Sequence, residues 1–308
     1  MYELVIVGGG AAGLTAAIYA ARAGLHYVLL EQDGYGGGQI QTTDRVDNYP
    51  GFYGVDGVEL AEKLVEHCQA LNVPVLYRTV EHIRKEDGIF LVQADGEEIQ
   101  TKSVIYAAGT RHKALEVPGE QKLAGLGVSF CATCDGAFFE GKTVAVVGSG
   151  DTAVSEAIYL GKICKTVHLL FRKDRLKAAQ ALQDRLLACD HIILHPETRV
   201  EGISGTEQVE GLQLSTPEGE CTLPCDGVFV AIGSVPATEI LDNLGICDEN
   251  GYIVAGETGE TPLPGFFAAG DIRTKQLRQF LTAAADGANA VDAAGRYLAT
   301  ISKGSPQS

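Results

Sequence analysis

Two short apolar runs in this sequence each lead directly into the same kind of glycine-rich turn. The first run, Tyr2–Val7, is followed by the turn Gly8–Gly13, and the second run, Thr143–Val147, by the turn Gly148–Ala153. A helix-favouring stretch comes after each turn. A strand, a tight turn and a helix in this order form the βαβ unit of a parallel sheet that is covered by helices. The sequence therefore predicts an α/β protein with two Rossmann-like domains.

The first copy of the pattern carries every part of a dinucleotide-binding fingerprint. We predict a helix from Leu14 to about Ala23 and a second strand, Tyr27–Leu30, that ends at Glu31. Backbone amides at the start of the helix bind a pyrophosphate, and an acidic residue at the end of the second strand binds ribose hydroxyls. A glycine turn alone is a weak signal, but strand, helix and acid together predict a nucleotide site.

The second copy differs at the position that reads the ribose. Glu31 lies 23 residues after Gly8, and the residue 23 positions after Gly148 is Phe171, which carries no charge. Arg172, Lys173, Arg175 and Lys177 follow it. An acid at this point selects the 2′-hydroxyl of NAD, whereas basic groups accommodate the 2′-phosphate of NADP. The second site is therefore predicted to bind a phosphorylated ribose; the alternative is that these residues are the solvated start of a helix.

A pair of cysteines, Cys131 and Cys134, lies just upstream of the second turn. A disulfide that closes a four-residue loop stabilises a fold by only about 2 kcal/mol, so stability is a weak reason to keep it. Zinc would need a second ligand pair, for which Cys221 and Cys225 are the one nearby candidate, and no histidine pair supports it. We expect no metal, and the favoured interpretation is a redox-active dithiol.

Asp135 directly follows the second thiol of this pair. Thiol–disulfide exchange needs a proton source when a thiolate leaves, and a carboxyl with a raised pKa can serve. The alternative is that Asp135 caps a helix before Gly136. The two roles are compatible.

Two further segments have the composition of ligand-binding loops. Gly36–Gln39 starts a glycine-rich loop that continues through Asp47–Gly51. Near the end of the chain, a predicted strand delivers Asp271 to the carboxyl edge of the sheet, with Arg278 and Gln279 just before a predicted helix. A carboxylate at that edge can hydrogen-bond a polyol chain, and the start of the helix can face a polar ring.

The overall composition excludes some classes of partner. The net charge of -16 disfavours non-specific binding to nucleic acid and to anionic lipid, because both depend on positive charge. Glu3 interrupts the only apolar stretch near the start, and no run is long and apolar enough to span a bilayer. We therefore expect a cytoplasmic protein with mostly reduced cysteines, no nucleic-acid partner and no membrane contact.

A change of character near residue 112 and a second one near residue 240 divide the chain. Residues 111–118 are polar and without periodicity, and the segment after Gly233 returns towards the first sheet. The predicted outer domain comprises residues 1–112 and 241–308, and the inner domain, residues 113–240, carries the dithiol. In this arrangement one nucleotide-binding domain is inserted into the other.

These motifs together resemble the low-molecular-weight thioredoxin reductases, the class II FAD-dependent pyridine nucleotide-disulfide oxidoreductases. The resemblance extends over essentially the whole chain and rests on six segments: Gly8–Gly13, Gly37–Gln39, Asn48–Gly51, Cys131–Gly136, Gly148–Ala153 and Gly270–Arg273 with Arg278-Gln279. It implies FAD in the outer domain, NADPH in the inner domain, a homodimer, and thioredoxin as the disulfide partner.

The resemblance also implies residue roles. Cys134 is the thiol that meets the flavin, Cys131 exchanges with the partner, and Asp135 is the acid/base. The implied flavin contacts are Gly8, Gly10, Ala11, Ala12, Gly13, Glu31, Gln32, Gly38, Gln39, Asn48, Ala108, Gly109, Asp271, Arg278 and Gln279. The implied NADPH contacts are Gly148, Gly150, Asp151, Thr152, Arg172, Lys173 and Lys177.

The sequence departs from this family at two places. Ser149 replaces a glycine of the second turn, and the phosphate-binding run reads Phe171-Arg172-Lys173 and then Lys177 where relatives have His-Arg-Arg and a further Arg. Lysine lacks the forked geometry of arginine, so a weaker NADPH preference is predicted and NADH is an alternative donor. Two other functions stay open: a related disulfide reductase or oxidase that uses NADH, ferredoxin or oxygen, and a non-catalytic flavin redox sensor.

Overall fold

The computed structural model describes residues 1–32, 36–43, 46 and 48–303. The chain forms two compact units. The first comprises residues 1–42, 49–111 and 235–308, and the second comprises residues 43–48 and 112–234. The chain passes from one unit to the other through β7 (Thr110–His112) and β16 (Ser234–Pro236), which pair as a two-stranded sheet.

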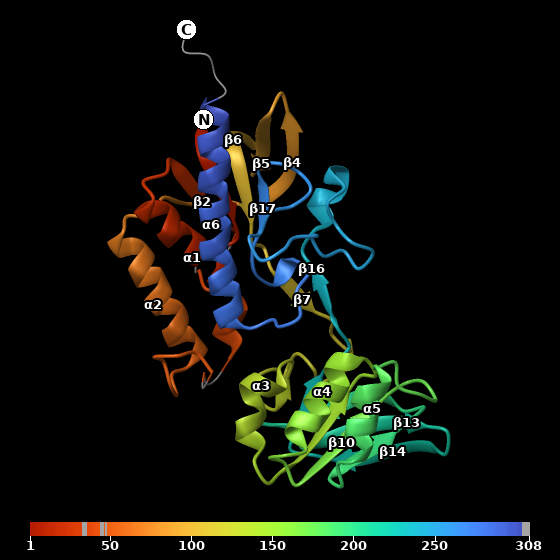
Figure 1. Ribbon diagram of the computed structural model, residues 1–308. Helices are drawn as coiled ribbons and strands as arrows, with labels where there is room; N and C mark the ends of the chain where they lie inside the picture. The colour runs from red at the N-terminus through yellow and green to blue at the C-terminus, as the bar shows by residue number, and fades with distance from the viewer. Residues whose placement is uncertain (33–35, 44–45, 47, 304–308) are drawn as a thin grey trace. The chain divides into compact units, whose positions relative to one another are not determined.

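The first unit is built on a parallel sheet with the strand order expected for a nucleotide fold. Its parallel strands are β1 (Tyr2–Val7), β2 (Tyr27–Glu31), β3 (Val75–Tyr77), β6 (Glu97–Tyr106) and β17 (Phe266–Ala268). They run in the order β3-β2-β1-β6, and β17 pairs with the end of β6. The last strand therefore comes from a segment 160 residues after β6 and completes the sheet (Figure 1).

An antiparallel extension continues the same sheet. β4 (Val80–Glu86) and β5 (Ile89–Ala94) pair antiparallel with each other, and β5 pairs antiparallel with β6. The tight turns after β4 and β5 place Asp87 at φ 48° and Asp95 at φ 45°, each followed by a glycine in the same region. Asp-Gly pairs favour tight turns of this kind, because both residues tolerate positive φ.

Three helices belong to this unit: α1 (Ala11–Arg22), α2 (Gly57–Ala70) and α6 (Phe280–Lys303). Alternate residues of β1 point to opposite faces of the sheet. Leu4 and Ile6 pack with α1 and α6, whereas Val5 and Val7 pack on the other face with β5. All four are almost fully buried, which explains why the strand reads as a continuous apolar run rather than an alternating one.

Helices α1 and α6 lie side by side at very short range (Figure 1). An ideal Cβ on Gly287 of α6 would lie 2.1 Å from the carbonyl oxygen of Ala12. Only a residue without a Cβ permits this approach. Helix α6 is the helix predicted to follow Arg278 and Gln279, and it ends at Lys303.

The second unit contains a fully parallel sheet. Its strands are β8 (Val128–Ser129), β9 (Thr143–Val147), β10 (Thr166–Leu170), β11 (Ile192–His195) and β15 (Gly227–Val230), in the order β11-β10-β9-β15-β8. The bounds of β9 are those of the apolar run Thr143–Val147 from which this strand was predicted. The two fingerprint copies therefore form the centres of two separate parallel sheets, and the α/β prediction is confirmed.

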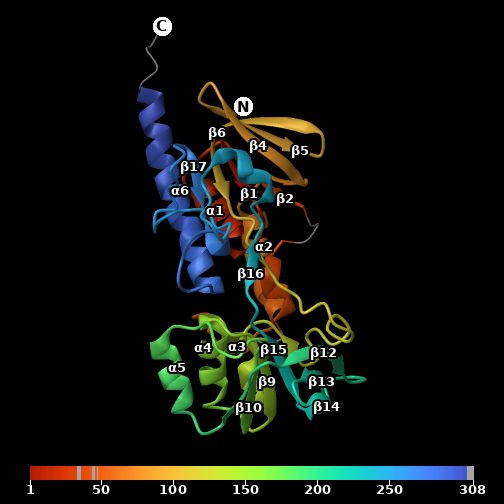
Figure 2. The same ribbon diagram turned by 90° about the vertical axis from the view of Figure 1, so that its right-hand side faces the viewer.

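Two layers cover this sheet. Helices α4 (Asp151–Leu160) and α5 (Gln180–Leu187) pack on one face, where the core includes Val146 and Leu169. An antiparallel sheet packs on the other, where the core includes Ala145 and Val228 (Figure 2). Its strands are β12 (Arg199–Ser204), β13 (Gly211–Thr216) and β14 (Gly219–Pro224). The remaining elements are η1 (Gly38–Thr42), α3 (Ala132–Asp135), η2 (Gly136–Phe139), η3 (Glu239–Leu244) and η4 (Gly270–Ile272).

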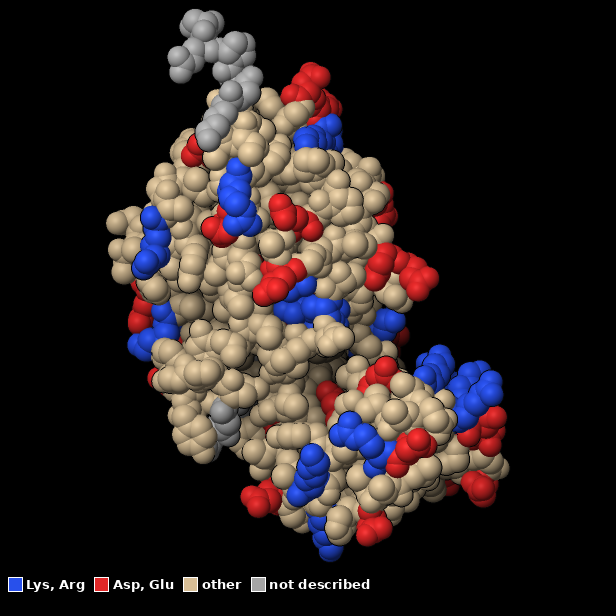
Figure 3. All heavy atoms as spheres, viewed as in Figure 1, with Lys and Arg blue, Asp and Glu red and all other residues tan. Residues whose placement is uncertain are grey.

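Charged side chains of both signs are interspersed over the face drawn in Figure 3. None of the helices in the described ranges combines the length and the apolar character that crossing a bilayer requires.

The contact between α1 and α6 leads to a prediction about two glycines of one helix. Gly287→Ala should destabilise the protein by about 2 kcal/mol, because overpacking against the backbone of α1 outweighs the better helix propensity of alanine. Gly295, where nothing lies within 4 Å of an added Cβ, is the matched control. Gly295→Ala should leave stability unchanged or raise it by up to about 1 kcal/mol. Urea unfolding of both variants measures the difference, and equal effects would contradict the assigned contact.

Candidate redox centre and nucleotide sites

Cys131 and Cys134 form a disulfide, with their Cα atoms 5.3 Å apart. Cys131 immediately precedes α3, and its carbonyl oxygen accepts hydrogen bonds from the amides of Cys134 (3.2 Å) and Asp135 (3.1 Å). The Thr133 hydroxyl lies 3.4 Å from the sulfur of Cys131. Both cysteines are partly exposed. The disulfide is therefore accessible from solvent, although backbone hydrogen bonds fix the turn that carries it. In the described part of the chain, no group of three His, Cys, Asp or Glu side chains could hold a metal ion.

Asp135 is oriented by a serine rather than by a helix end. The Ser129 hydroxyl donates a hydrogen bond to Asp135 Oδ2 (2.6 Å) and accepts one from the amide of Cys131 (3.1 Å). Asp135 occupies the N-cap position of η2, as the alternative interpretation of this residue predicts, but its side chain makes no capping hydrogen bond there. Ser129 therefore connects the carboxylate with the backbone of the first cysteine. Sequence reasoning missed it, although a serine two residues before a cysteine is well placed for such a local bond.

A second carboxyl lies next to the dithiol turn. Glu156 of α4 accepts a hydrogen bond from the amide of Ala132 (3.4 Å) through Oε1. Its Oε2 is buried without a hydrogen-bond partner among the described residues. Burial raises the pKa of Glu156 from 4.5 to about 7; the Ala132 bond opposes this rise and the charge of Asp135 adds to it. Glu156 was also missed, and the signal for it was an acid within the apolar stripe of a helix.

The second glycine turn leaves open space at one of its positions. Gly148 has φ +153°, and an added Cβ there would lie 2.3 Å from the carbonyl oxygen of Ala231. At Gly150, by contrast, nothing lies within 4 Å of an added Cβ. The first glycine is required by close packing with the neighbouring strand, and the second leaves room for a ligand beside the start of α4. Asp151 and Thr152 form the exposed first turn of that helix.

The basic segment is held against this turn by backbone hydrogen bonds. The carbonyl oxygen of Ser149 accepts from the amides of Lys177 (2.8 Å) and Ala178 (3.1 Å), and Asp151 Oδ1 accepts from the amide of Ala179 (2.8 Å). Arg172, Lys173 and Lys177 are exposed. The alternative that these residues start a helix is wrong, because α5 begins only at Gln180.

The first glycine turn shows the same division of roles. Gly8 has φ +100°, and an added Cβ on it would lie 2.6 Å from the carbonyl oxygen of Ala107. An added Cβ on Gly13 would lie 1.7 Å from the carbonyl oxygen of Gly8. An added Cβ on Gly10 would meet nothing closer than the Gly37 oxygen at 4.0 Å. The amide of Gly9 donates a hydrogen bond to the Glu31 carboxylate, so the acidic residue lies beside the turn, as the fingerprint predicts.

Three predicted segments of the first unit meet at this turn. The amide of Gly37 donates to the carbonyl oxygen of Gly9 (2.7 Å), and an added Cβ on Gly38 would lie 3.2 Å from the Cα of Gly10. An added Cβ on Gly270 would lie 3.0 Å from the Cβ of Ala12. Segments from three distant parts of the sequence thus converge on one place.

The other predicted flavin residues are distributed around this unit, with one exception. Gln39 donates a hydrogen bond to the carbonyl oxygen of Thr110, next to Gly109 at φ +68°. Gln32 and Ala108 are exposed. Asn48 belongs to residues 43–48, which group with the second unit.

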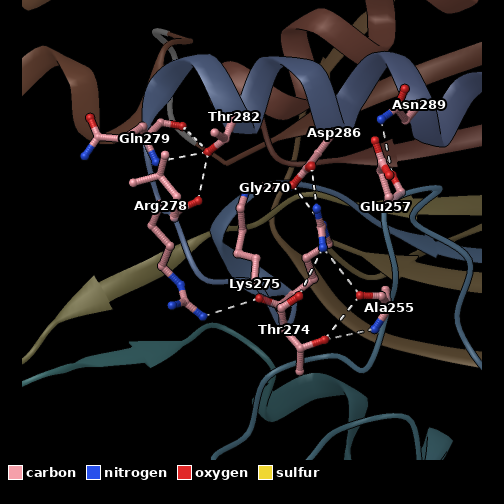
Figure 4. Close-up of polar contacts among 12 residues, drawn as sticks. Ala255, Glu257, Gly270, Thr274, Lys275, Arg278, Gln279, Thr282, Asp286 and Asn289 are labelled. Carbon is pink, nitrogen blue, oxygen red and sulfur yellow. Dashed lines mark hydrogen bonds and ion pairs between the residues drawn. The ribbon is translucent and has the colours of Figure 1, made fainter. Parts of the chain in front are cut away.

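The turn that carries Asp271 is fixed by a buried ion cluster centred on Asp286 of α6 (Figure 4). Asp286 Oδ2 accepts hydrogen bonds from the Gly270 amide (3.0 Å), Arg273 Nε (2.9 Å) and Lys275 Nζ (2.8 Å). Its Oδ1 accepts from Arg273 Nη2 (2.6 Å). One carboxylate thus joins α6 to the turn at three points. Asp271 Oδ1 is buried without a hydrogen-bond partner among the described residues, and burial raises the pKa of Asp271.

Arg278 and Gln279 lie where α6 begins (Figure 4). The Arg278 guanidinium lies 4.3 Å from the ring centre of Tyr252, and its Nε donates to the backbone oxygen of Asp271 (3.4 Å). The amide of Gln279 donates to the Thr282 hydroxyl (3.1 Å).

Comparison with known proteins identifies the family. The profile of the pyridine nucleotide-disulphide oxidoreductases matches residues 2–287. The chain belongs to this family. Thioredoxin reductases of Listeria monocytogenes and Bacillus subtilis are each 40% identical over 97% of this chain, which covers 94% and 95% of those proteins. The predicted resemblance to thioredoxin reductases is confirmed.

Solved structures agree with this assignment. The thioredoxin reductase from Streptococcus pyogenes matches with a TM-score of 0.91 and 39% identity, covering 97% of this chain and 99% of its own. The Lactococcus lactis thioredoxin reductase in the FR conformation matches with a TM-score of 0.69 and 36% identity, covering 97% of this chain and 100% of its own. The fold of this chain therefore matches that of solved thioredoxin reductases over nearly its whole length.

The residues present fit the flavin and the pyridine nucleotide that this family uses. The open side of Gly10 and the orphaned Asp271 Oδ1 offer a pyrophosphate position and a hydroxyl acceptor within one unit. The open side of Gly150 and the exposed basic segment offer a second phosphate position in the other unit. Each unit thus holds residues suited to one nucleotide.

The ion cluster leads to a prediction about two aspartates of α6. Asp286→Asn should lower stability by about 3 kcal/mol or more, because two buried cations lose their counter-charge. Asp292 is the matched control, since it pairs with Arg296 on the exposed side of the same helix, with 71% and 57% of their side chains accessible. Asp292→Asn should cost less than about 1 kcal/mol. Thermal unfolding of both variants tests this, and comparable losses would refute the central role of Asp286.

Proposed function

We propose that this oxidoreductase is a thioredoxin-disulfide reductase that passes electrons from NADPH through FAD and the Cys131/Cys134 pair to thioredoxin. The observation that carries the proposal is the disulfide on α3, which has an oriented carboxylate beside it and directly precedes a nucleotide-binding βαβ unit. Relatives that are 40% identical over 97% of this chain are named thioredoxin reductase.

The proposed exchange uses the two thiols in sequence. The Cys131 thiolate attacks one sulfur of the thioredoxin disulfide, forms a mixed disulfide with it and expels the other thioredoxin sulfur as a thiolate. The Cys134 thiolate then attacks Cys131, restores the Cys131–Cys134 disulfide and releases the second thioredoxin sulfur. Asp135, held by Ser129, supplies the proton to a departing thiolate. The net result is one disulfide reduced and one formed.

The first unit is the proposed site of FAD, which carries the electron pair from the nicotinamide to the disulfide when bound. The turn Gly8–Gly13 and the start of α1 would hold its pyrophosphate, and Glu31 would bind the ribose hydroxyls. Asp271 Oδ1 would accept a hydrogen bond from a hydroxyl of the flavin side chain. Arg278 and Gln279, at the start of α6, would face the flavin ring.

The second unit is the proposed site of NADPH. Gly148, Gly150, Asp151 and Thr152 would hold the pyrophosphate at the start of α4. Arg172, Lys173 and Lys177 would neutralise the 2′-phosphate, and the hydrogen bonds to Ser149 support their position beside the turn.

The assembly and location of the protein are also inferred from the resemblance. We infer a homodimer in the cytoplasm, in line with the thioredoxin reductases of the bacterial relatives. Nucleic acid and membranes are not expected among its partners, given the net charge of -16.

Replacing the outer thiol tests the proposed exchange. Cys131→Ser should still allow NADPH to bleach the flavin absorbance, but should lose at least about 1000-fold in thioredoxin reduction, because no thiolate attacks the partner. Cys221→Ser, at an exposed free cysteine of the same unit, should keep full activity. Stopped-flow absorbance and a coupled thioredoxin assay measure the two halves separately. Normal thioredoxin turnover by Cys131→Ser would overturn the proposed roles.

Removing two basic residues tests the proposed NADPH site. The Arg172→Ala, Lys173→Ala double variant should raise KM for NADPH about tenfold or more at unchanged kcat, since each charge-assisted bond to a phosphate contributes about 1.5–3 kcal/mol. KM for NADH should not change. Lys162→Ala, at an exposed lysine outside the segment, is the control. An equal loss with NADH and NADPH would show that these residues do not read the 2′-phosphate.

The alternative electron donor has one observation in its favour. A ferredoxin-flavin thioredoxin reductase from Clostridium acetobutylicum matches with a TM-score of 0.56 and 28% identity. Lysines replace two family arginines in this chain at Lys173 and Lys177. Flavin bleaching by reduced ferredoxin, with none by NADPH or NADH, would favour that alternative; bleaching without any thioredoxin turnover would favour a redox sensor.

A further inference from the structure

The proposed exchange leaves one buried carboxyl beside the dithiol without a role. Glu156 comes from α4, where it lies on the side that packs against α3. Its Oε1 lies 3.4 Å from the amide of Ala132, the residue directly after Cys131. Its Oε2 is buried and has no hydrogen-bond partner in the part of the chain that the structure describes. A buried carboxyl oxygen without a donor is better tolerated protonated than charged.

The packing around this carboxyl keeps it close to the dithiol turn. An added Cβ on Gly136, directly after α3, would lie 3.0 Å from side-chain atoms of both Leu160 and Tyr159 of α4. The end of the dithiol turn and α4 are therefore closely packed, which fixes the turn beside the helix that carries Glu156.

One other ionisable group faces Glu156. Asp135 of α3 affects the carboxyl through its charge, and it is the one titratable group from α3, α5, β9 or β10 that does so among the described residues. His168 of β10 is instead engaged with His195 at 2.9 Å. Among the described residues, Asp135 is thus the one group whose charge acts on the Glu156 carboxyl.

We propose that Glu156 is a positioning residue that controls the ionisation of the Cys131 thiol in the reduced enzyme, by the negative charge it places beside the Ala132 amide. The inference rests on the proposed function, in which Cys131 must become a thiolate to attack its partner. While Glu156 is neutral, the thiolate forms with one fewer negative charge nearby. Once Glu156 ionises, its charge disfavours the thiolate.

The direction of the pH effect follows from the pKa of Glu156 near 7. Below that pH the carboxyl is neutral and adds no charge beside the dithiol turn. Above it, the added negative charge disfavours the Cys131 thiolate. Reactivity of Cys131 should therefore rise with pH less steeply than a single ionisation predicts, because the two sites titrate as a coupled pair. By reciprocity, a thiolate at Cys131 favours the protonated form of Glu156.

The experiment measures the thiolate directly. The holoenzyme is reduced with dithiothreitol, freed of reductant under argon, and treated with iodoacetamide for timed intervals from pH 6 to pH 9. Peptide mass spectrometry then quantifies alkylation at Cys131 apart from the six other free cysteines and Cys134. Alkylation rate follows the thiolate fraction.

Glu156→Gln keeps the shape of the side chain and an acceptor for the Ala132 amide but cannot ionise. Its alkylation rate at Cys131 should equal that of the wild type at pH 6 and exceed it about three- to tenfold at pH 8, as a shift of up to one pKa unit requires. Glu140→Gln, an exposed acid downstream on the same segment, is the charge-matched control and should follow the wild type at every pH. Glu156→Asp should retain a pH-dependent ratio.

Two outcomes would overturn the proposal. A ratio between Glu156→Gln and the wild type that stays constant from pH 6 to pH 9 would indicate a structural effect alone. If the Glu156→Gln protein does not fold, the wild-type profile still decides, because a single ionisation curve at Cys131 excludes the coupling. Neither result depends on thioredoxin, so a failure of the proposed function would appear separately, as absent turnover of the wild type.

Discussion

Backbone-to-backbone contact at the two glycine turns is the constraint on which both units depend. Gly13 and Gly8 in one unit, and Gly148 in the other, allow a helix or strand to approach to distances that a Cβ would block. With the turns closed in this way, α1 and α4 start directly at the edge of their sheets. The space beside Gly10 and Gly150 stays open. In each turn, therefore, one glycine allows close packing and a neighbouring glycine leaves room for a phosphate.

The dithiol turn has a simple backbone, but its chemistry depends on side chains from several elements. Its geometry needs only a short helix and two backbone hydrogen bonds to Cys131. Its chemistry, however, depends on groups from different elements: Ser129 on β8, Asp135 on α3 and Glu156 on α4. Two carboxyls near two sulfurs make proton transfer and thiolate formation mutually dependent. A positive charge at this place would favour the thiolate form of a cysteine, but a thiolate stabilised in this way is also a weaker nucleophile.

Patterns in the sequence were sufficient for features that depend on neighbouring residues. The two fingerprints and the bounds of β9 depend on local periodicity and turn chemistry, and the structure contains them. The dithiol was predictable because the short spacing of the two cysteines is itself typical of a redox-active pair. Features that depend on tertiary contacts were not predictable. Glu156 looks like an ordinary helical acid until α3 packs on it, and the pairing of Asp286 with Arg273 and Lys275 joins residues 11 to 13 positions apart that only the fold brings together. The basic segment was open to a helical interpretation because its hydrogen bonds to Ser149 arise from a turn more than 20 residues away.

The pairing of β7 with β16 has a consequence for how such a chain is put together. The main segment of the second unit, residues 112–234, begins at the end of β7 and finishes at the start of β16. Amide hydrogen bonds from Lys113 to Gly233 (3.0 Å) and from Ala237 to Gly109 (3.1 Å) join the two strands at both ends of their pairing. The entry and exit points of this segment are therefore adjacent. A module with adjacent ends fits into the loop of a host without separating the host's halves, so gene-level insertion, excision or circular permutation at this ladder leaves each hydrophobic core intact.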